Sequence, residues 1–305
     1  MDKIAIIVLN YNTTKETIDC LFSLNKMNKE GFKSKIFVVD NGSKEVFQLS
    51  NKFSREDFEL IRSEANLGFC GGNNLGVHYS IKNYNPDYFL FLNSDTLVDP
   101  NFLIVLHQNI LLERKIGIVV PKIYFASGCE YHRSSYNKKD LGKVIWYAGG
   151  IIDWENFNTF HFGVDEIDRN QFDKLKFTEF ATGCCFLIKR ELVENFGCFN
   201  ERYFLYYEDV ELSQRLINKG YKIVFCPQSF IYHVNGASSE GFGGKLQVYY
   251  QTRNSLLFFF TYGNWKTKLR IFKLALHFLV QGDMTRKQAV WHFFTQQLGK
   301  NNFIK

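Results

Sequence analysis

The sequence predicts an α/β fold with a mostly parallel central sheet that is flanked by helices. Short apolar runs alternate with helix-sized segments in the first hundred residues, and polar clusters follow three of these runs. Hydrophobic residues make up 46% and charged residues 22% of the chain, which is ordinary globular usage. A length of 305 residues allows one large domain or two.

The apolar runs of the N-terminal part are rich in Ile, Val, Phe and Leu, and they span residues 3–9, 35–40, 58–62 and 88–92. Continuous apolar runs are typical of strands in a sheet that is covered on both faces, and the segments between them can hold helices. Further on, the patterns predict mixed β structure near 144–152, a strand at 183–188, a helix at 210–219 that ends at Gly220, and a strand at 222–226.

The C-terminal segment, residues 246–305, is predicted to be a helical extension, with Leu269, Phe272, Leu276 and Leu279 on one stripe. Residues 264–305 contain eight Lys or Arg and one acid, while the whole chain has a formal net charge of +6, so the basicity belongs to this tail. Charges interrupt the tail too often for a membrane span. Two interpretations stay open: these helices pack on the main domain, or they lie on an anionic membrane surface.

Neither the cysteines nor the first residues indicate secretion. Seven cysteines without a C-x-x-C pair predict reduced, mostly buried thiols rather than a zinc or redox site. Met1 leads into an apolar strand without the pattern of a signal peptide, so we expect a protein that starts in the cytosol.

Polar clusters follow three of the predicted strands. Ligands of open α/β sheets bind at the carboxyl ends of strands, so these clusters supply candidates for nucleotide binding. A carboxylate there can accept the N3 hydrogen of uracil or thymine, although Asp and Asn also favour this position as a local Asx turn. The candidates from the three clusters are Asn10, Asn12, Asp40, Asn41 and Asn93.

Two residues are candidate metal ligands. Asp95 follows the strand at 88–92, where a carboxylate can hold Mg²⁺ or Mn²⁺ against two phosphates. The alternative for Asp95 is an N-cap of the helix that begins near Pro100, but Asp99 suits that role better. His233 follows a short strand-like run and can bind a metal through its neutral imidazole, although a lone His is more often structural.

Glu208 and Asp209 open a predicted helix. Acids in a first helical turn are commonly only partners of the helix dipole. Here the aromatic run at 204–207 precedes them and can form an apolar wall that shelters a reacting hydroxyl and shifts the pKa of a carboxylate. This pattern makes Asp209, with Glu208, the candidate for acid–base catalysis.

A glycine-rich segment at 68–74 adds Gly71, Gly72 and Asn73 to the candidates for nucleotide binding, because glycine lets a backbone approach ribose or phosphate closely. It is not a dinucleotide-binding fingerprint, which would follow the first strand. The sequence also lacks a Walker A lysine and a nucleophile elbow.

Taken in order, these motifs resemble the family 2 inverting glycosyltransferases of the GT-A fold, particularly the rhamnosyltransferase-like group. The resemblance covers residues 3 to about 258, and its blocks are Val39-Asp40-Asn41-Gly42-Ser43, Asn66-Leu67-Gly68-Phe69 with Gly71-Gly72-Asn73-Asn74, Leu92-Asn93-Ser94-Asp95-Thr96, Thr182-Gly183, Tyr207-Glu208-Asp209-Val210-Glu211-Leu212 and Arg253-Asn254. These blocks add Asn66 and Arg253 to the expected contacts with the nucleotide sugar.

The resemblance implies a role for four of the candidates. Asp40 would contact the nucleobase, Asp95 would bind a divalent metal, His233 would complete the metal site and Asp209 would be the general base. The sequence departs from the family at one point, because the metal motif is often Asp-x-Asp and its first position here is Asn93. A neutral amide is a weaker ligand, so we expect a lower affinity for Mg²⁺ or Mn²⁺.

The resemblance also implies a domain plan and a reaction. Residues 1–245 would form a GT-A catalytic domain, with a nucleotide-sugar half at about 1–120 and an acceptor half at about 121–245, and residues 246–305 would form the extension. The enzyme would transfer a sugar, first rhamnose from dTDP-rhamnose and otherwise a hexose from a UDP-hexose, to a hydroxyl of a glycan or lipid-linked glycan in cell-surface polysaccharide synthesis. It would be cytoplasmic and peripheral on the inner face of the membrane through residues 264–305.

Two other functions are alternatives to sugar transfer. A sugar nucleotidyltransferase would have a glycine-rich loop with Arg after the first strand, which Asn10-Tyr11-Asn12 lacks. A non-catalytic nucleotide-sugar binding protein would not need the Glu208-Asp209 pair. A nucleic-acid partner is not expected, because the basicity is confined to the tail and no nucleic-acid-binding motif is recognisable.

Overall fold

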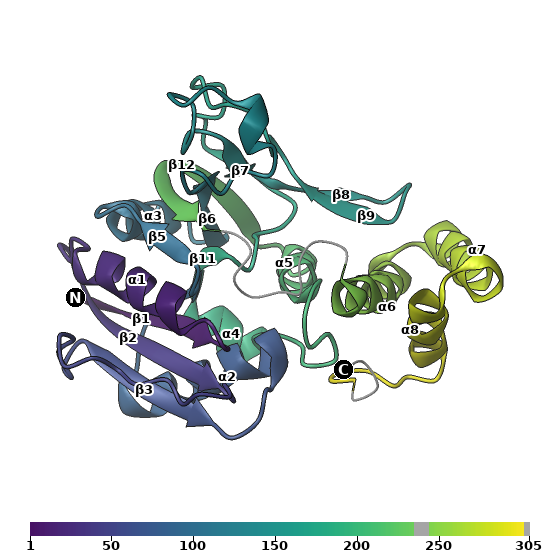
Figure 1. Cartoon of the computed structure of the whole chain (residues 1–305), viewed down its shortest axis with the longest axis horizontal. Helices are drawn as coiled ribbons and strands as arrows, with labels where there is room; N and C mark the ends of the chain where they lie inside the picture. Colours follow the sequence, from purple (N-terminus) through teal and green to yellow (C-terminus); the bar gives the residue numbers. More distant parts are fainter. Residues whose placement is uncertain (235–243, 302–305) are drawn as a thin grey trace.

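A ten-stranded mixed sheet forms the centre of the protein (Figure 1). The computed structural model describes residues 1–234 and 244–301. The order along the sheet is β10-β12-β6-β11-β4-β1-β2-β3, and β5 pairs with β12 while β7 pairs with β6. The strands that form this path are β1 (Asp2–Asn10), β2 (Phe32–Asn41), β3 (Phe58–Ser63), β4 (Tyr88–Asn93), β6 (Ile116–Phe125), β10 (Lys176–Phe177), β11 (Cys185–Lys189) and β12 (Lys222–His233).

The N-terminal half confirms the predicted parallel strands, because β4, β1, β2 and β3 are parallel neighbours. The central residues of β1, β2 and β4 are buried, as the continuous apolar runs require, while the edge strand β3 is partly buried. Helices α1 (Thr14–Asn25) and α2 (Gly68–Asn83) pack against this half. Gly76 of α2 leaves no room for a methyl group, since a Cβ there would lie 2.7 Å from Ile7, so glycine brings α2 close to the sheet.

Strand β11 joins the two halves of the sheet. It lies between β4 and β6 and runs antiparallel to both. Beyond it, β12 runs parallel to β6 and extends the predicted strand at 222–226 as far as His233, past an irregularity between Cys226 and Phe230. Helices α3 (Phe102–Ile110), α4 (Arg190–Phe196) and α5 (Glu208–Ile217) belong to this half. The helix predicted at 210–219 therefore begins two residues earlier, at Glu208.

The region predicted to be mixed β structure near 144–152 contains β7 (Ile145–Tyr147) and β8 (Gly150–Asp153), followed by β9 (Asn158–His161). Two more short elements precede it, β5 (Thr96–Val98) and η1 (Arg133–Ser135). A buried lysine ties this region to β6. The Lys122 Nζ atom donates to Asp168 and Asp173, each at 2.7 Å. Because an unpaired buried ammonium would be costly, these two acids fix the loop at 168–173 to the sheet.

The C-terminal extension is helical, as predicted, and consists of α6 (Lys245–Tyr262), α7 (Trp265–Gln281) and α8 (Met284–Phe294). Phe258 and Phe259 of α6 are buried in the same core as the sheet, while α7 and α8 lie farther out (Figure 1). In residues 1–234 and 244–301, no helix is both long enough and apolar enough to cross a bilayer. All seven cysteines belong to these residues and are free thiols, five of them buried.

Candidate active site

The predicted polar clusters meet at one edge of the sheet. The strand register places Asn10 beside Asp40 and Leu9 beside Asn93, and Asp40 also lies beside Arg62 of β3. The carboxyl ends of β1, β2, β3 and β4 therefore carry these residues side by side, as the parallel arrangement requires.

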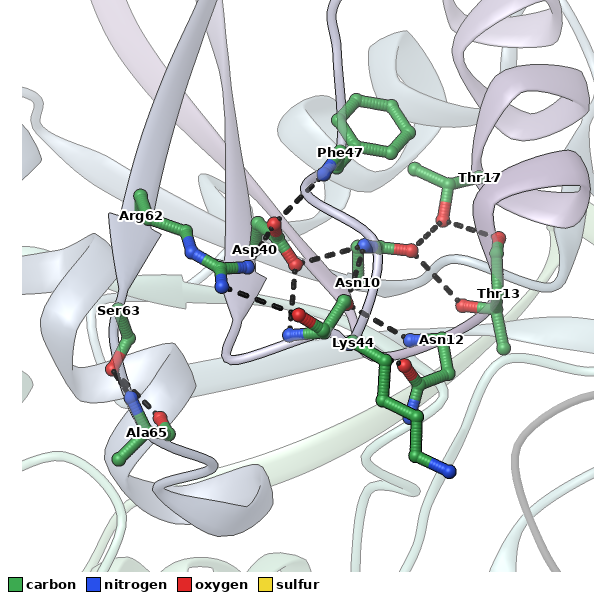
Figure 2. Close-up of polar contacts among 11 residues, drawn as sticks. Asn10, Asn12, Thr13, Thr17, Asp40, Lys44, Phe47, Arg62, Ser63 and Ala65 are labelled. Atoms are coloured by element: carbon green, nitrogen blue, oxygen red, sulfur yellow. Dashed lines mark hydrogen bonds and ion pairs between the residues drawn. The ribbon is translucent and has the colours of Figure 1, made fainter.

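Asp40 is a structural centre of this edge, as Figure 2 shows. Its side chain is fully buried. Its Oδ1 atom accepts from Asn10 Nδ2 at 3.1 Å, and its Oδ2 atom accepts from the backbone N–H of Phe47 at 2.9 Å and from Arg62. Burial alone would raise the pKa of Asp40, but these hydrogen bonds and the Arg62 guanidinium lower it. The contact of Asp40 with a nucleobase stays a prediction, and in this structure both carboxylate oxygens accept hydrogen bonds from protein groups.

The side chain of Asn10 also forms hydrogen bonds with protein groups through both its nitrogen and its oxygen. Its amide group donates to Asp40 and to Ser43 Oγ at 3.1 Å each, and its Oδ1 atom accepts from the hydroxyls of Thr13 and Thr17 (Figure 2). Asn12 differs, because it is exposed and adopts a left-handed conformation with φ 58°. Of these two predicted nucleotide contacts, only Asn12 reaches solvent.

Asn41 and Asn66 shape the turn that leads into α2. Asn41 Nδ2 donates to the Gly68 carbonyl at 3.0 Å, and Asn41 Oδ1 accepts from the backbone of Leu67 at 2.9 Å. Asn66 Oδ1 accepts from the backbone of Gly68 at 2.8 Å. Both side chains therefore hold this turn. Asn41 is also buried, and its amide groups bond to the protein. The contact of the two residues with the nucleotide sugar stays a prediction.

The glycine-rich segment is the first part of α2 rather than a loop that cradles phosphate. The backbone N–H groups of Phe69 and Cys70 both donate to the Phe204 carbonyl, at 2.8 and 3.3 Å, so this helix end is already occupied. A Cβ at Gly72 would lie 2.4 Å from Leu9, so this glycine serves the packing of helix on sheet. Gly71 and Asn73 lie in the same buried first turns. The approach of this backbone to a nucleotide stays a prediction, and the contacts in the structure are with other parts of the protein.

The structure brings Asp95 and His233 together. His233 at the end of β12 pairs with Thr96 of β5, and its Nε2 atom lies 3.2 Å from Asp95 Oδ1. Both residues are buried. Burial alone would raise the pKa of Asp95, but the charge of His233 and the hydrogen bond to it bring this pKa below its usual value. Asp95 is therefore a carboxylate over the whole physiological range.

Two aromatic residues that the sequence did not single out complete the surroundings of His233. The Trp146 ring packs edge to face on the His233 ring at a centroid distance of 4.5 Å, and His161 packs against the same Trp146. Burial lowers the pKa of His161 to about 4, so it is neutral at physiological pH. The His233 Nδ1 atom is buried without a hydrogen-bond partner. Alternation in 144–152 indicated a strand, but gave no sign that Trp146 faces His233.

The described residues contain no cluster of three or more His, Cys, Asp or Glu side chains that could hold a metal. A cation at Asp95 and His233 would therefore take its other ligands from phosphate oxygens and water, which is how Mg²⁺ is usually held beside nucleotides. Asp95 Oδ1 lies beside His233 Nε2, and the other ring nitrogen of His233, Nδ1, has no hydrogen-bond partner, so carboxylate and imidazole groups are both present for such a partial site. The structure thus fits a metal that binds together with a diphosphate.

Asp209 is held by two backbone groups. Gly183 N–H donates to Asp209 Oδ2 at 2.7 Å, and Val210 N–H donates to Asp209 Oδ1 at 2.8 Å. Burial outweighs these bonds and raises the pKa of Asp209. The neighbouring Cys184 carbonyl accepts from the backbone of Asn93, so residues 183 and 184 connect the acid pair to the end of β4. Asp209 and the metal candidates therefore belong to one site.

Glu208 is a buried carboxyl group with an oxygen that lacks a hydrogen-bond partner. Its side chain is 5% exposed, and the Oε2 atom has no hydrogen-bond partner. Burial, with a further contribution from the charge of Asp209, raises the pKa of Glu208 well above its usual value. The native state therefore binds the Glu208 proton more tightly than the unfolded chain does, so its stability is greatest at low pH and falls as the pH rises through the raised pKa.

We expect Glu208→Gln to stabilise the protein by about 1–2 kcal/mol at pH 8. At this pH the buried Glu208 must either ionise without a full set of partners or take up a proton from solution, and a neutral glutamine avoids both costs. At pH 4 the variant and the parent should have similar free energies of unfolding. Urea denaturation at both pH values measures this, with the exposed Glu64→Gln as control. A variant less stable than the parent at pH 8 would contradict the interpretation.

A strained loop presents the acid pair. Phe204, Tyr206 and Tyr207 all have left-handed backbones, with φ of 65°, 68° and 70°. Each such residue costs about 1–3 kcal/mol and persists only where its surroundings enforce it. The aromatic residues that were predicted to form a wall also anchor this loop, because Phe204 stacks on Tyr250 and Tyr207 packs against Phe258 of α6.

Arg253 and Asn254 of α6 enforce that loop. The Asn254 amide donates to the carbonyls of Tyr203, Leu205 and Tyr206 at 2.8–2.9 Å. Arg253 is fully buried and donates to the carbonyls of Tyr203, Arg202 and Gly299, the last at 2.7 Å. The predicted contact of Arg253 with the nucleotide sugar stays a prediction, and in this structure its donors bind the backbone of the loop and of the C-terminal segment.

Sequence comparisons agree with the predicted family. The family model described as "Glycosyltransferase like family 2" matches residues 2–253. A relative named low-salt glycan biosynthesis hexosyltransferase Agl10, from Haloferax volcanii, is 27% identical over 260 residues, which cover 84% of this chain and 75% of that protein. An N-acetylglucosaminyl-diphospho-decaprenol L-rhamnosyltransferase from Mycobacterium tuberculosis is 40% identical over 52 residues, 17% of each chain.

Solved structures agree in fold. GalNAc-T7 with UDP, GalNAc and Mn²⁺ superposes with a TM-score of 0.60 at 14% identity, over 97% of this chain and 56% of that one, so the chain spans little more than half of that protein. The mannosyltransferase PcManGT from Pyrobaculum calidifontis, in complex with GDP-Man and Mn²⁺, gives 0.52 at 14% identity, over 96% and 73%. The GT-A fold is thereby confirmed. The chain belongs to glycosyltransferase family 2 and is a glycosyltransferase.

Proposed function

We propose that this enzyme transfers a sugar from a nucleotide diphosphate to an acceptor hydroxyl with inversion, and that Asp209 is the general base. The observation that carries the proposal is the half-buried Asp209, which two backbone N–H groups orient at the start of α5. A raised pKa makes this carboxylate a stronger base than an exposed Asp, as proton abstraction from a hydroxyl needs.

In the proposed reaction the acceptor oxygen attacks the anomeric carbon while its proton moves to a carboxylate oxygen of Asp209. The bond between the anomeric carbon and the diphosphate oxygen breaks, and the nucleotide diphosphate leaves. One displacement inverts the configuration. Glu208, which holds its proton more tightly than a usual Glu, keeps negative charge beside Asp209 low.

Asp95 and His233 would hold Mg²⁺ or Mn²⁺ together with the diphosphate, and Asn93 lies beside them at the end of β4. When bound, this cation would neutralise charge on the leaving diphosphate. For the nucleotide itself we propose contacts from Tyr11 and Asn12, which are exposed at the same edge. The network around Asp40 would keep that edge rigid.

The donor and acceptor are proposed by similarity. The relative from Mycobacterium tuberculosis is named as a rhamnosyltransferase and that from Haloferax volcanii as a hexosyltransferase. We propose dTDP-rhamnose first and a UDP-hexose second as donor, with a glycan or lipid-linked glycan of cell-surface polysaccharide as acceptor. For the latter acceptor, the enzyme would work at the inner face of the membrane.

A thermal-shift panel tests the donor proposal. A ligand that binds only the native state raises the melting temperature, so dTDP, UDP and their sugar conjugates are compared with and without Mn²⁺. A larger shift with one base selects the donor class. Donor binding without transfer or hydrolysis, over a panel of acceptors, would favour the non-catalytic alternative, while no shift with any nucleotide would reject both.

We expect His233→Ala to abolish the Mn²⁺-dependent part of the nucleotide shift while leaving the metal-free part, because it removes one of two protein ligands. Metal affinity should fall about tenfold or more, which corresponds to about 1.4 kcal/mol. Titration of Mn²⁺ at saturating nucleotide measures the change. His132→Ala is the control, since His132 is exposed on a surface loop. An unchanged Mn²⁺ titration would remove His233 from the metal site.

A further inference from the structure

Helix α7 presents an apolar stripe to solvent. Trp265, Leu269, Phe272, Leu276 and Val280 are all exposed, and their spacing of three or four residues places them on one face. The opposite face is buried and includes Ile271 and Ala275. Helix α7 is therefore apolar on both sides, although nothing within residues 1–234 and 244–301 covers its outer side.

The stripe continues onto α8. Phe272 contacts Phe294 at a ring-centroid distance of 5.8 Å, which joins the outer faces of the two helices. Met284, at the turn between the helices, is 79% exposed, and Trp291 is 59% exposed. A contiguous apolar surface of this kind on a soluble fold usually marks an interaction site. We call these exposed side chains of α7 and α8 the outer face.

Lysines border the outer face. Lys266 and Lys268 lie over the rings of Trp265 and Phe260, with 5.6 Å between each ammonium and the ring centroid, and the exposed Lys273 follows Phe272. The one acid in residues 264–301, Asp283, is paired with Arg286. The border is therefore positively charged around an apolar centre.

From these contacts we infer that the outer face of α7 and α8 docks on the surface of an anionic lipid bilayer. An apolar stripe with Trp and a lysine border is the pattern of a helix that lies in the membrane interface. A protein partner fits less well, because lysine is depleted in protein interfaces. None of the described helices can span a bilayer, so the helices lie on the surface rather than cross it.

Docking also relates the membrane to the active site. Helix α6 packs on α7 and α8, and the same helix carries Arg253 and Asn254, which hold the loop before Glu208. A bilayer under the outer face would thus be two helices away from the acid pair. Membrane docking would bring the enzyme to the proposed lipid-linked acceptor, and this role of docking rests on the proposed function. Docking itself needs no donor.

Co-sedimentation of the full chain with vesicles tests the inference, with vesicles of phosphatidylcholine alone and of equal parts phosphatidylcholine and phosphatidylglycerol. The first variant combines Lys266→Glu, Lys268→Glu and Lys273→Glu. It should lose about 100-fold or more in partitioning onto the anionic vesicles, as expected for three lysines near a charged surface. The matched control reverses Lys138, Lys139 and Lys143, which are exposed in the loop before β7, and it should bind like the parent.

The second variant combines Leu269→Gln, Phe272→Gln and Trp291→Gln, all at exposed positions, so it should fold like the parent by circular dichroism. It should lose binding to both kinds of vesicle. Equal losses in the α7 lysine variant and its control would overturn the inference, as would a parent that self-associates through the outer face and ignores vesicles. Nucleotide thermal shifts should be unchanged in all variants, so failure of docking is separable from failure of the proposed transfer.

Discussion

Asp209→Asn is expected to lower kcat for sugar transfer by about 10²- to 10⁴-fold, the usual contribution of a general base. The amide cannot take a proton from the acceptor hydroxyl. It can still accept one of the two backbone hydrogen bonds, from Gly183 or Val210, so the start of α5 should keep its shape. Donor binding, measured by thermal shift, should stay within a factor of about two or three of the parent.

The pH profile gives a second check on Asp209. Because burial raises its pKa, the parent should lose activity as the pH falls through a value above that of an ordinary Asp, and the acid pair with Glu208 sets the apparent midpoint. Asp153→Asn, an exposed acid on β8, is a matched control and should retain full activity. More than about a tenth of the parent's kcat in Asp209→Asn would reject the base assignment.

Asn254→Ala is expected to destabilise the protein by about 3 kcal/mol and to lower kcat further than unfolding explains. The change removes a donor from three carbonyls of the strained loop. Tyr203 keeps its hydrogen bond from Arg253, whereas the carbonyls of Leu205 and Tyr206 lose theirs, and each unsatisfied buried group costs about 1–3 kcal/mol. The left-handed residues Tyr206 and Tyr207 then relax, and Glu208 and Asp209 lose their positions.

The measurement for Asn254 is kcat well below the melting temperature, where the variant is fully folded. Donor KM should change little, because a separate network around Asp40 holds the nucleotide edge. Asn83→Ala is the control, since its side chain donates only to the Tyr79 carbonyl of its own helix at the surface. A purely structural role for Asn254 would leave kcat and its pH profile unchanged in the folded variant.

Much of the fold followed from the sequence. Continuous apolar runs have few alternatives to buried parallel strands, so β1 to β4 were predicted within three residues at either end. The pairing of Asp95 with His233 depends on the antiparallel contact of β5 with β12, which no local pattern encodes. The resemblance to the family predicted that both residues belong to the metal site. The tertiary structure places His233 Nε2 3.2 Å from Asp95 Oδ1.

Three of the predicted ligand contacts stay predictions for one physical reason. Asp40, Asn10 and Arg253 are polar residues in family motifs, and their types alone predict contacts with a ligand. In the structure each uses its hydrogen-bonding groups on neighbouring loops, because a buried polar group must find partners somewhere. A sequence shows that a residue can donate or accept, but not whether the protein itself has already used that capacity.

Strand β11 has a consequence for biosynthesis. It occupies the centre of the sheet, between β4 and β6, but it follows both in the chain. On the ribosome, the open edge of β4 and the edge of β6 that pairs with β11 wait for residues 185–189, and the opposite edge of β6 stays open until β12 emerges. Unpaired strand edges invite association with other chains. The nascent polypeptide is therefore most exposed to aggregation during the synthesis of residues 126–233.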